Sequence, residues 1–244
     1  MNPDEFRKQA HLMVEWMADY MEHVEDYPVK SQVAPKTIYN QIESSIPDHG
    51  QEMEAIFKDF KEVVLPGITH WQNPNFFAYF QANTSPPSIL AEMLTATLGV
   101  QGMKWETSPV ATELEEKMME WLRDGIGIPN EWAGVIQDSA SMATLSAILT
   151  ARERLSDYQV NENGFEGFTK LRVYCSDQTH SSIEKGAKIA GVGKKNVIKI
   201  PTNDLLEMRS GLLQEQIEKD IEEGYHPLCI VAALGTTGTM AMDP

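Results

Sequence analysis

The sequence has few basic residues. Its 20 Lys and Arg residues stand against 36 Asp and Glu residues, which gives a formal net charge of −16 at pH 7. A chain of this charge repels phosphate backbones and anionic membrane surfaces, and no basic cluster offsets the repulsion. We therefore expect neither a nucleic acid nor a membrane as a partner. The acidic residues are predicted to lie on solvated helix faces, such as 113–120 and 218–223.

Cysteine and long apolar runs are also scarce. The two cysteines, Cys175 and Cys229, each fall in a short apolar run typical of a strand, which predicts buried free thiols in a reducing compartment. No window approaches the roughly 20 apolar residues of a membrane-spanning helix. The first residues lack the basic and then apolar segments of a secretory signal. Together these features predict a cytoplasmic protein, and no residue pattern predicts a metal site.

The N-terminal part is predicted to be helical. Residues 3–25 have the spacing of an amphipathic helix, with Asn2 as its cap and Pro3 at its first position. A proline-rich linker is expected over 28–47. The broad apolar side of the first helix must be buried against something, such as another subunit. Its members are Phe6, Met13, Trp16, Met17 and Tyr20. Further helices are expected over 50–64, 87–98 and 109–123, the last capped by Ser108.

From residue 133 onward, strand-like apolar runs alternate with helical ones. This alternation predicts right-handed crossovers on a mostly parallel sheet. Strands are expected at 133–137, 171–175, 196–200 and 228–234, and helices at 141–155, 179–190 and 210–223.

Polar residues follow three of these strands. Ser139 and Ser141 lie at a predicted helix start, where free backbone N–H groups and the helix dipole favour an anion such as a phosphate monoester. Either serine could instead be an ordinary N-cap. His180 and Thr237 follow two other strands, and each alone is an ordinary loop residue. Because ligands bind at the carboxyl ends of strands in open α/β sheets, the three groups together predict a binding site.

A set of motifs, in one order along the chain, points to a family. They are Leu-Pro-Gly-Ile-Thr-His-Trp at 65–71, Phe-Phe-Ala-Tyr-Phe at 76–80, Ser-Pro at 108–109 with Thr-Glu-Leu-Glu at 112–115, Gly-Val-Ile-Gln at 134–137 with Ser-Ala-Ser at 139–141, Ser-Asp-Gln at 176–178 with His-Ser-Ser at 180–182, and Leu-Gly-Thr-Thr at 234–237. With them the chain resembles the N-terminal part of the group II pyridoxal-phosphate-dependent amino-acid decarboxylases, and most closely the aromatic-L-amino-acid decarboxylases.

The resemblance implies an aminotransferase-like (fold type I) α/β fold, with a mostly parallel sheet preceded by an N-terminal helical segment. Residues 1–84 would form the N-terminal helical segment that makes a homodimer. Residues 85–244 would form the first part of the cofactor-binding α/β domain, incomplete at its C-terminus. The family's Schiff-base lysine and its pyridine-pairing aspartate would lie in a C-terminal half, so this chain alone is expected to be inactive.

The resemblance also implies site residues. Ser139, Ala140 and Ser141 would hold the phosphate of pyridoxal 5′-phosphate. His180 would be a catalytic residue that stacks on the pyridine ring and contributes to proton transfer, and Thr237 would lie near the ring's substituents. The substrate side chain would be lined by Trp71, Tyr79, Phe80 and the position of Ala82.

The implied reaction is decarboxylation of an L-amino acid, with tyrosine, DOPA or tryptophan expected as substrate. Three departures from the family pattern bear on the substrate more than on the cofactor. Asp138 replaces a common glycine, Gln81-Ala82 replaces a proline-threonine pair, and Gln101, Met103 and Lys104 replace more apolar residues. An aldehyde-forming enzyme, a decarboxylase of another amino acid, and a non-catalytic truncated homologue that pairs with a full-length subunit stay as alternatives.

Overall fold

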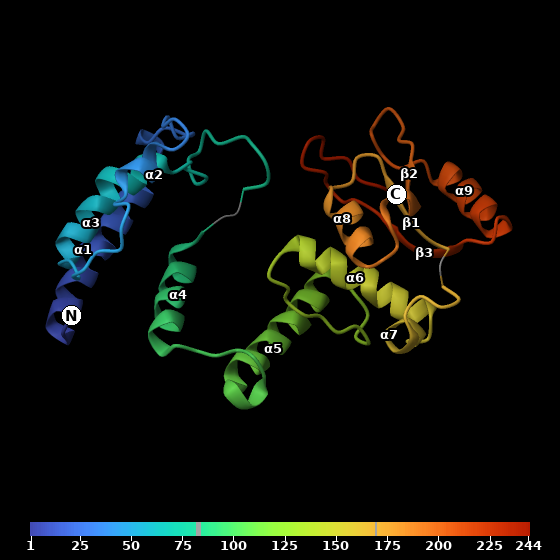
Figure 1. Cartoon of the computed structure of the whole chain (residues 1–244), viewed down its shortest axis with the longest axis horizontal. Helices are drawn as coiled ribbons and strands as arrows, with labels where there is room; N and C mark the ends of the chain where they lie inside the picture. The colour runs from blue at the N-terminus through green and yellow to red at the C-terminus, as the bar shows by residue number, and fades with distance from the viewer. Residues whose placement is uncertain (82–83, 169) are drawn as a thin grey trace. The chain divides into compact units, whose positions relative to one another are not determined.

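The computed structural model describes residues 1–81, 84–168 and 170–244. These residues form two compact units, Met1–Thr95 and Ala96–Pro244. Figure 1 shows the elements of both units.

The first unit is built on the amphipathic helix predicted at the N-terminus. Helix α1 spans Pro3–Glu22, and the Asn2 side chain accepts a 2.8 Å hydrogen bond from the backbone N–H of Glu5, as expected of its cap. Trp16 stacks on Tyr20 and makes edge contacts with Phe57 and Phe60. The remaining helical segments are a 3-10 turn at Val24–Asp26, α2 at Thr37–Gln41, α3 at Met53–Asp59, a π turn at Phe60–Val64 and a 3-10 turn at Leu65–Gly67.

Two further helices match their predicted positions closely. Helix α4 spans Pro86–Leu98 and α5 spans Pro109–Ile126, after a 3-10 turn at Trp105–Thr107. Ser108 occupies the N-cap position of α5, but its side chain makes no capping hydrogen bond. The helix ends at Gly127, whose φ of 74° is the left-handed conformation that favours glycine.

The second unit contains a parallel sheet of three strands in the order β2-β1-β3. The strands are β1 at Leu171–Ser176, β2 at Val197–Ile200 and β3 at His226–Val231. Helix α8, Ser182–Ile189, connects β1 to β2, and α9, Ser210–Glu222, connects β2 to β3. Both strand pairs are parallel, which confirms the predicted α/β class.

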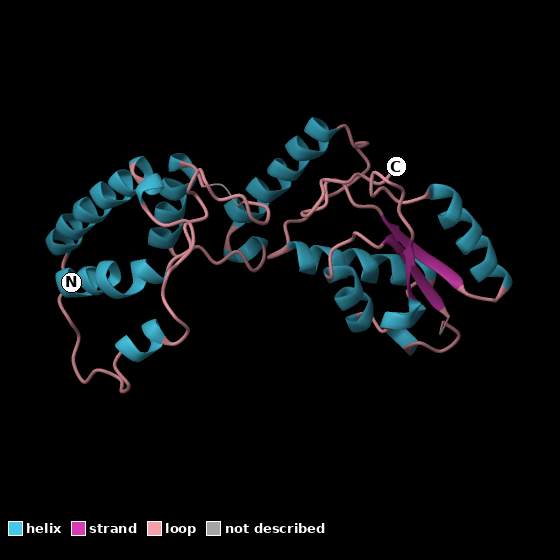
Figure 2. Ribbon diagram, turned by 90° about the horizontal axis from the view of Figure 1, so that it is seen from above, coloured by secondary structure: helices cyan, strands magenta, loops and turns pink. Residues whose placement is uncertain are grey.

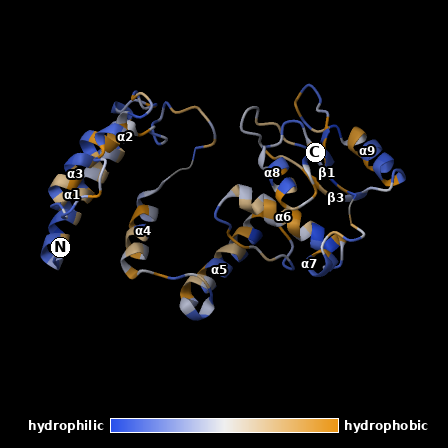
Figure 3. Ribbon diagram, in the orientation of Figure 1, coloured by the Kyte–Doolittle hydropathy of each residue, from blue (hydrophilic) through white to orange (hydrophobic). Residues whose placement is uncertain are grey.

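Helices cover both faces of this sheet, as Figure 2 shows. Helix α6, Ala140–Leu155, and α8 pack on one face, where Val173 and Cys175 of β1 lie. Helix α9 packs on the other face, against Tyr174 and Ile200. Figure 3 shows the apolar residues along α6. The short helix α7, Gln159–Asn163, follows α6.

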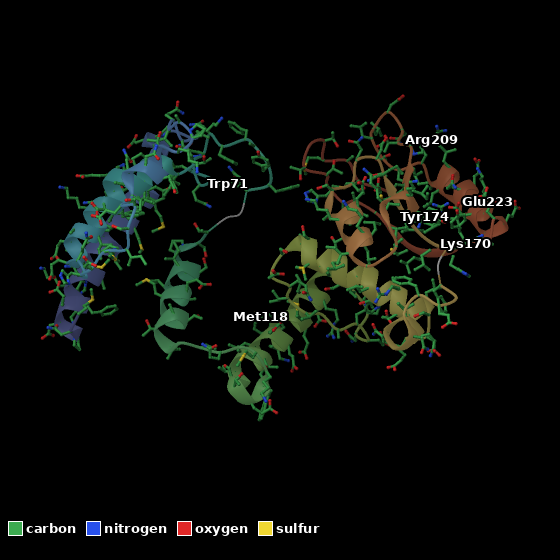
Figure 4. The ribbon with its side chains drawn as sticks, in the orientation of Figure 1. Trp71, Met118, Lys170, Tyr174, Arg209 and Glu223 are labelled. Atoms are coloured by element: carbon green, nitrogen blue, oxygen red, sulfur yellow. The ribbon has the colours of Figure 1, made fainter. Side chains whose placement is uncertain are left out.

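A buried polar cluster fastens α9 to the sheet. The Tyr174 hydroxyl donates a 2.9 Å hydrogen bond to Asp220, which also accepts from Gln216. At the amino end of β1, the Lys170 ammonium donates to the backbone carbonyl of Glu223, and Figure 4 labels both residues. Tyr174 and Asp220 are fully buried, so the hydrogen bond between them gives each buried polar group a partner inside the core.

The strand predicted at 133–137 is wrong. This segment has no regular secondary structure and no strand partner among the described residues, and Val135 and Ile136 are 66% and 60% exposed. A strand needs hydrogen bonds from a neighbour, and here the carboxylate of Glu115 accepts the 2.8 Å hydrogen bond from the N–H of Ile136. The last strand also ends earlier than predicted, at Val231, and Leu234 instead forms an isolated antiparallel bridge with Met242.

In the described part of the chain, no helix combines the length and apolar character that crossing a membrane requires.

Candidate active site

The start of α6 offers free backbone donors beside a capping serine. The Ser139 hydroxyl accepts a 3.3 Å hydrogen bond from the N–H of Met142, and its carbonyl accepts from Ala143. The N–H groups of Ala140 and Ser141 have no acceptor among the described residues. Both residues are exposed. Their unpaired donors and the two hydroxyls fit a phosphate group, since the helix dipole favours an anion at the same place.

His180 lies in the loop between β1 and α8. The loop is held by Thr179, whose hydroxyl donates 2.8 Å to the carbonyl of Ser176 and accepts 3.1 Å from the Lys199 ammonium. His180 itself is exposed, and its Nδ1 lies 2.9 Å from the hydroxyl and 3.2 Å from the backbone nitrogen of Ser182. The loop thus presents an imidazole whose Nδ1 is already hydrogen-bonded to Ser182.

Thr237 lies in a tight loop that follows β3. Thr236 and Thr239 share a 2.6 Å hydrogen bond inside this loop, and Thr237 is exposed. The loop is closed by Asp243, whose buried carboxylate accepts 2.8 Å hydrogen bonds from the N–H groups of Met208 and Ala233. Sequence reasoning missed Asp243, because a single aspartate after a loop carries no signal of such partners.

All three segments lie at the carboxyl edge of the sheet. A groove of about 380 Å³ separates α6 from β3, and its lining runs from Ala143 in the first turn of α6 to Ala232 after β3. A Cβ on Gly186, one turn into α8, would lie 3.6 Å from Leu145, one turn into α6. The two helices therefore start near the same edge. The structure thus places Ser139, His180 and Thr237 on segments of one neighbourhood.

The aromatic residues expected to line the substrate belong to the first unit. Trp71, labelled in Figure 4, stacks on Phe76 and on Tyr79, with ring centroids 4.7 and 5.5 Å apart. Trp71, Tyr79 and Phe80 are all exposed, at 39%, 75% and 56%. Ala82 lies outside the described residues.

Two buried polar residues anchor the aromatic segment. His70 is 2% exposed and its Nδ1 shares a 2.7 Å hydrogen bond with the Tyr20 hydroxyl. Burial lowers the pKa of His70, which favours the neutral ring. The Asn73 amide donates to the carbonyls of Val24 and Tyr27. Neither His70 nor Asn73 was predicted from the sequence, although both lie close to Trp71, which was predicted as a site residue.

Comparison with known proteins identifies the family. Residues 35–244 match the model described as the pyridoxal-dependent decarboxylase conserved domain. The chain belongs to this family. The resemblance found in the sequence is thereby confirmed, and so is pyridoxal phosphate as the cofactor of the family.

Relatives and solved structures agree with this assignment. The chain is 40% identical over 252 residues to phenylacetaldehyde synthase of Arabidopsis thaliana, and 39% identical over 256 residues to tyrosine decarboxylase of Papaver somniferum. These alignments cover all of this chain and 51% and 49% of the relatives, so the chain spans about half the length of the curated relatives it matches. A solved structure of Catharanthus roseus tryptophan decarboxylase in complex with L-tryptophan superposes with a TM-score of 0.92 at 39% identity. The superposition covers all of this chain and 52% of the tryptophan decarboxylase chain. This likeness confirms the fold type I architecture.

Proposed function

We propose that this chain is part of a pyridoxal-phosphate-dependent decarboxylase that converts an aromatic L-amino acid into its amine and CO2. The observation that carries the proposal is the pair of unpaired N–H groups at Ala140 and Ser141, at the carboxyl edge of a parallel sheet. When bound, pyridoxal phosphate accepts the electron pair that remains on the amino-acid α-carbon after CO2 leaves.

The residues of this edge have separate roles in the proposal. The backbone of Ala140 and Ser141 and the Ser141 hydroxyl bind the phosphate, while Ser139 keeps the helix start in place through its bond to Met142. His180 stacks on the ring and holds a proton at Nε2, the nitrogen without a hydrogen-bond partner among the described residues. Thr237 meets the ring's substituents.

An aromatic substrate follows from the segment around Trp71. The stacked rings of Trp71 and Tyr79, together with the exposed ring of Phe80, form an apolar lining for an aromatic side chain. Aromatic pairs gain energy beyond the area that they bury, and they exclude water from the carboxylate that leaves.

An aldehyde-forming reaction is the second candidate, because a 40% identical relative is a phenylacetaldehyde synthase. In that reaction the amino acid, O2 and water give the aldehyde, CO2, ammonia and hydrogen peroxide, so O2 is the oxidant and is reduced to the peroxide. A decarboxylase of a non-aromatic amino acid and a non-catalytic homologue that pairs with a full-length subunit are further outcomes that the activity test separates.

The proposal also includes two protein partners and a compartment. A C-terminal half supplies the lysine that holds the cofactor covalently, and a second copy forms a homodimer through residues 1–84. The exposed apolar side chains of α1, Phe6, Leu12 and Met21, support the second copy. Two free thiols, Cys175 and Cys229, on neighbouring strands support a reducing, cytoplasmic location.

Cofactor binding tests the phosphate site directly. The double variant S139A/S141A should bind pyridoxal phosphate at least about tenfold more weakly, because hydrogen bonds to a charged group are each worth about 1.5–3 kcal/mol. Binding of pyridoxal, which lacks the phosphate, should not change. Ser146→Ala, farther along α6, is the matched control and should leave both affinities unchanged. Equal weakening for both ligands would refute a phosphate site.

Activity is tested on the complete protein with pyridoxal phosphate. L-Tyrosine, L-DOPA, L-tryptophan and L-phenylalanine are compared with L-glutamate, and amine, aldehyde, CO2 and O2 uptake are measured. Amine and CO2 without O2 uptake support the decarboxylase, and aldehyde with O2 uptake supports the second candidate. No turnover of any amino acid, with the cofactor bound, would identify a non-catalytic homologue. His180→Ala should retain the cofactor and lose most of the turnover.

A further inference from the structure

We infer that Ser182 is a positioning residue that holds the neutral ring of His180 in the tautomer with its proton on Nε2. The inference rests on the proposed function for its catalytic meaning, but the tautomer is a property of this chain alone. It would decide which nitrogen His180 offers to a bound amino acid or cofactor.

The hydrogen-bond geometry around Nδ1 carries the argument. The backbone N–H of Ser182 donates to His180 Nδ1 over 3.2 Å. An amide N–H can only donate, so the nitrogen that it meets must have a free lone pair. A proton on Nδ1 would face the amide proton, and the neutral ring therefore carries its single proton on Nε2.

The hydroxyl of Ser182 strengthens the same choice. Its Oγ lies 2.9 Å from Nδ1, and because Nδ1 already accepts from the amide, the hydroxyl is the donor in this pair. The hydroxyl hydrogen can rotate toward Nδ1, as serine hydroxyls do. Two donors from one residue thus converge on one ring nitrogen.

Ser182 is a rigid donor because it opens a helix that is packed into the core. It is 6% exposed, and the next apolar residues of α8, Ile183 and Ala187, are 5% and 0% exposed. The backbone of His180 is tied to the same helix, since its carbonyl accepts a 3.2 Å hydrogen bond from Ile183. Both the ring and the main chain of His180 are therefore held by hydrogen bonds from residues of α8.

The consequence is a defined donor at the exposed side of the ring. Nε2 has no hydrogen-bond partner in the described part of the chain, and His180 is exposed. A histidine whose second nitrogen is fixed by a neighbour presents its other nitrogen in one state. A proton-transfer role for His180 thus operates from Nε2.

Nitrogen-15 NMR on the histidine-labelled chain tests the tautomer without any ligand. The chain has six histidines, and His180→Gln identifies the signals of His180. We expect the coupling pattern of a ring protonated on Nε2 at a pH where the ring is neutral. In Ser182→Ala the amide donor stays and the hydroxyl is lost, so the population protonated on Nδ1 should rise about fivefold, the effect of one hydrogen bond.

Ser181→Ala is the matched control, because the neighbouring serine is exposed and its side chain makes no capping hydrogen bond. It should leave the tautomer unchanged. In the complete enzyme, Ser182→Ala should lower kcat by less than about twofold, because a fivefold rise of the minor tautomer still leaves most rings protonated on Nε2, with little change in KM, and Ser182→Thr should restore it. A wild-type ring that is protonated on Nδ1, or equally on both nitrogens, would overturn the inference even if Ser182→Ala failed to fold. That result would leave the phosphate-site test unaffected, so the two failures are distinguishable.

Discussion

The hydrogen bond between Tyr20 and His70 should be a main source of stability in the first unit. Tyr20→Phe removes only the hydroxyl, which lies 2.7 Å from His70 Nδ1, and leaves the stacking of Tyr20 on Trp16 in place. His70 is buried, so the variant leaves a polar nitrogen without a partner and without water. Such a loss costs about 1–3 kcal/mol.

Urea unfolding of the first unit measures this cost. Replacing the exposed Trp105, Trp121 and Trp132 by Phe leaves Trp16 and Trp71 as fluorescent reporters, and both belong to the first unit. With a urea dependence of about 1–3 kcal/mol per M, a loss of about 2 kcal/mol lowers the midpoint by roughly 1 M.

Tyr27→Phe is the control for ring contacts. Tyr27 also contacts His70, with ring centroids 4.8 Å apart, but its hydroxyl has no hydrogen-bond partner among the described residues. Its removal should change stability by less than about 0.5 kcal/mol. If both variants lose the same stability, the hydroxyl of Tyr20 is not the anchor and the reasoning fails.

Three further outcomes follow from buried polar groups. Burial raises the pKa of Cys229 to about 11, and burial with the bond to Asp220 raises that of Tyr174. The free energy of unfolding should therefore be highest below about pH 9 and fall as pH rises, by up to about 1.4 kcal/mol per pH unit for each group. In melting curves at alkaline pH, Cys229→Ala or Tyr174→Phe should remove the part of this pH dependence that the replaced group causes. Burial lowers the pKa of His70, so its contribution should be present above about pH 6.5 and lost as pH falls through the lowered value; His70→Gln should flatten this acid limb. Asp243→Asn replaces one of two acceptor oxygens by a donor, so thermal unfolding should show a loss of about 1.5–3 kcal/mol and equilibrium dialysis weaker binding of pyridoxal phosphate.

Much of the fold is predictable because its signals are local. Asn2, the 3.6-residue spacing of α1 and the alternation of strands and helices after residue 170 each act within one element. The strand predicted at 133–137 failed for the opposite reason. Its apolar run is genuine, but a strand exists only where a neighbour supplies hydrogen bonds, and the run itself does not encode that neighbour.

The site divides in the same way. Ser139, His180 and Thr237 could be predicted as site residues because each follows an apolar run within a few residues, which is visible in the sequence, and their roles stay predictions. The anchors His70 and Asp243 were not found, because their partners lie 50 and 35 residues away along the chain. A buried polar group pairs with whatever the fold brings to it, and this pairing leaves no local pattern.

The start of α6 shows why two interpretations of one motif need not compete. A helix begins with four backbone N–H groups that lack partners inside the helix, and a capping side chain satisfies one of them. Ser139 takes the N–H of Met142, and the N–H groups of Ala140 and Ser141 stay free for a ligand. A good cap therefore does not weaken the case for an anion site. It fixes the first turn from which the free donors project, and so makes that site more rigid.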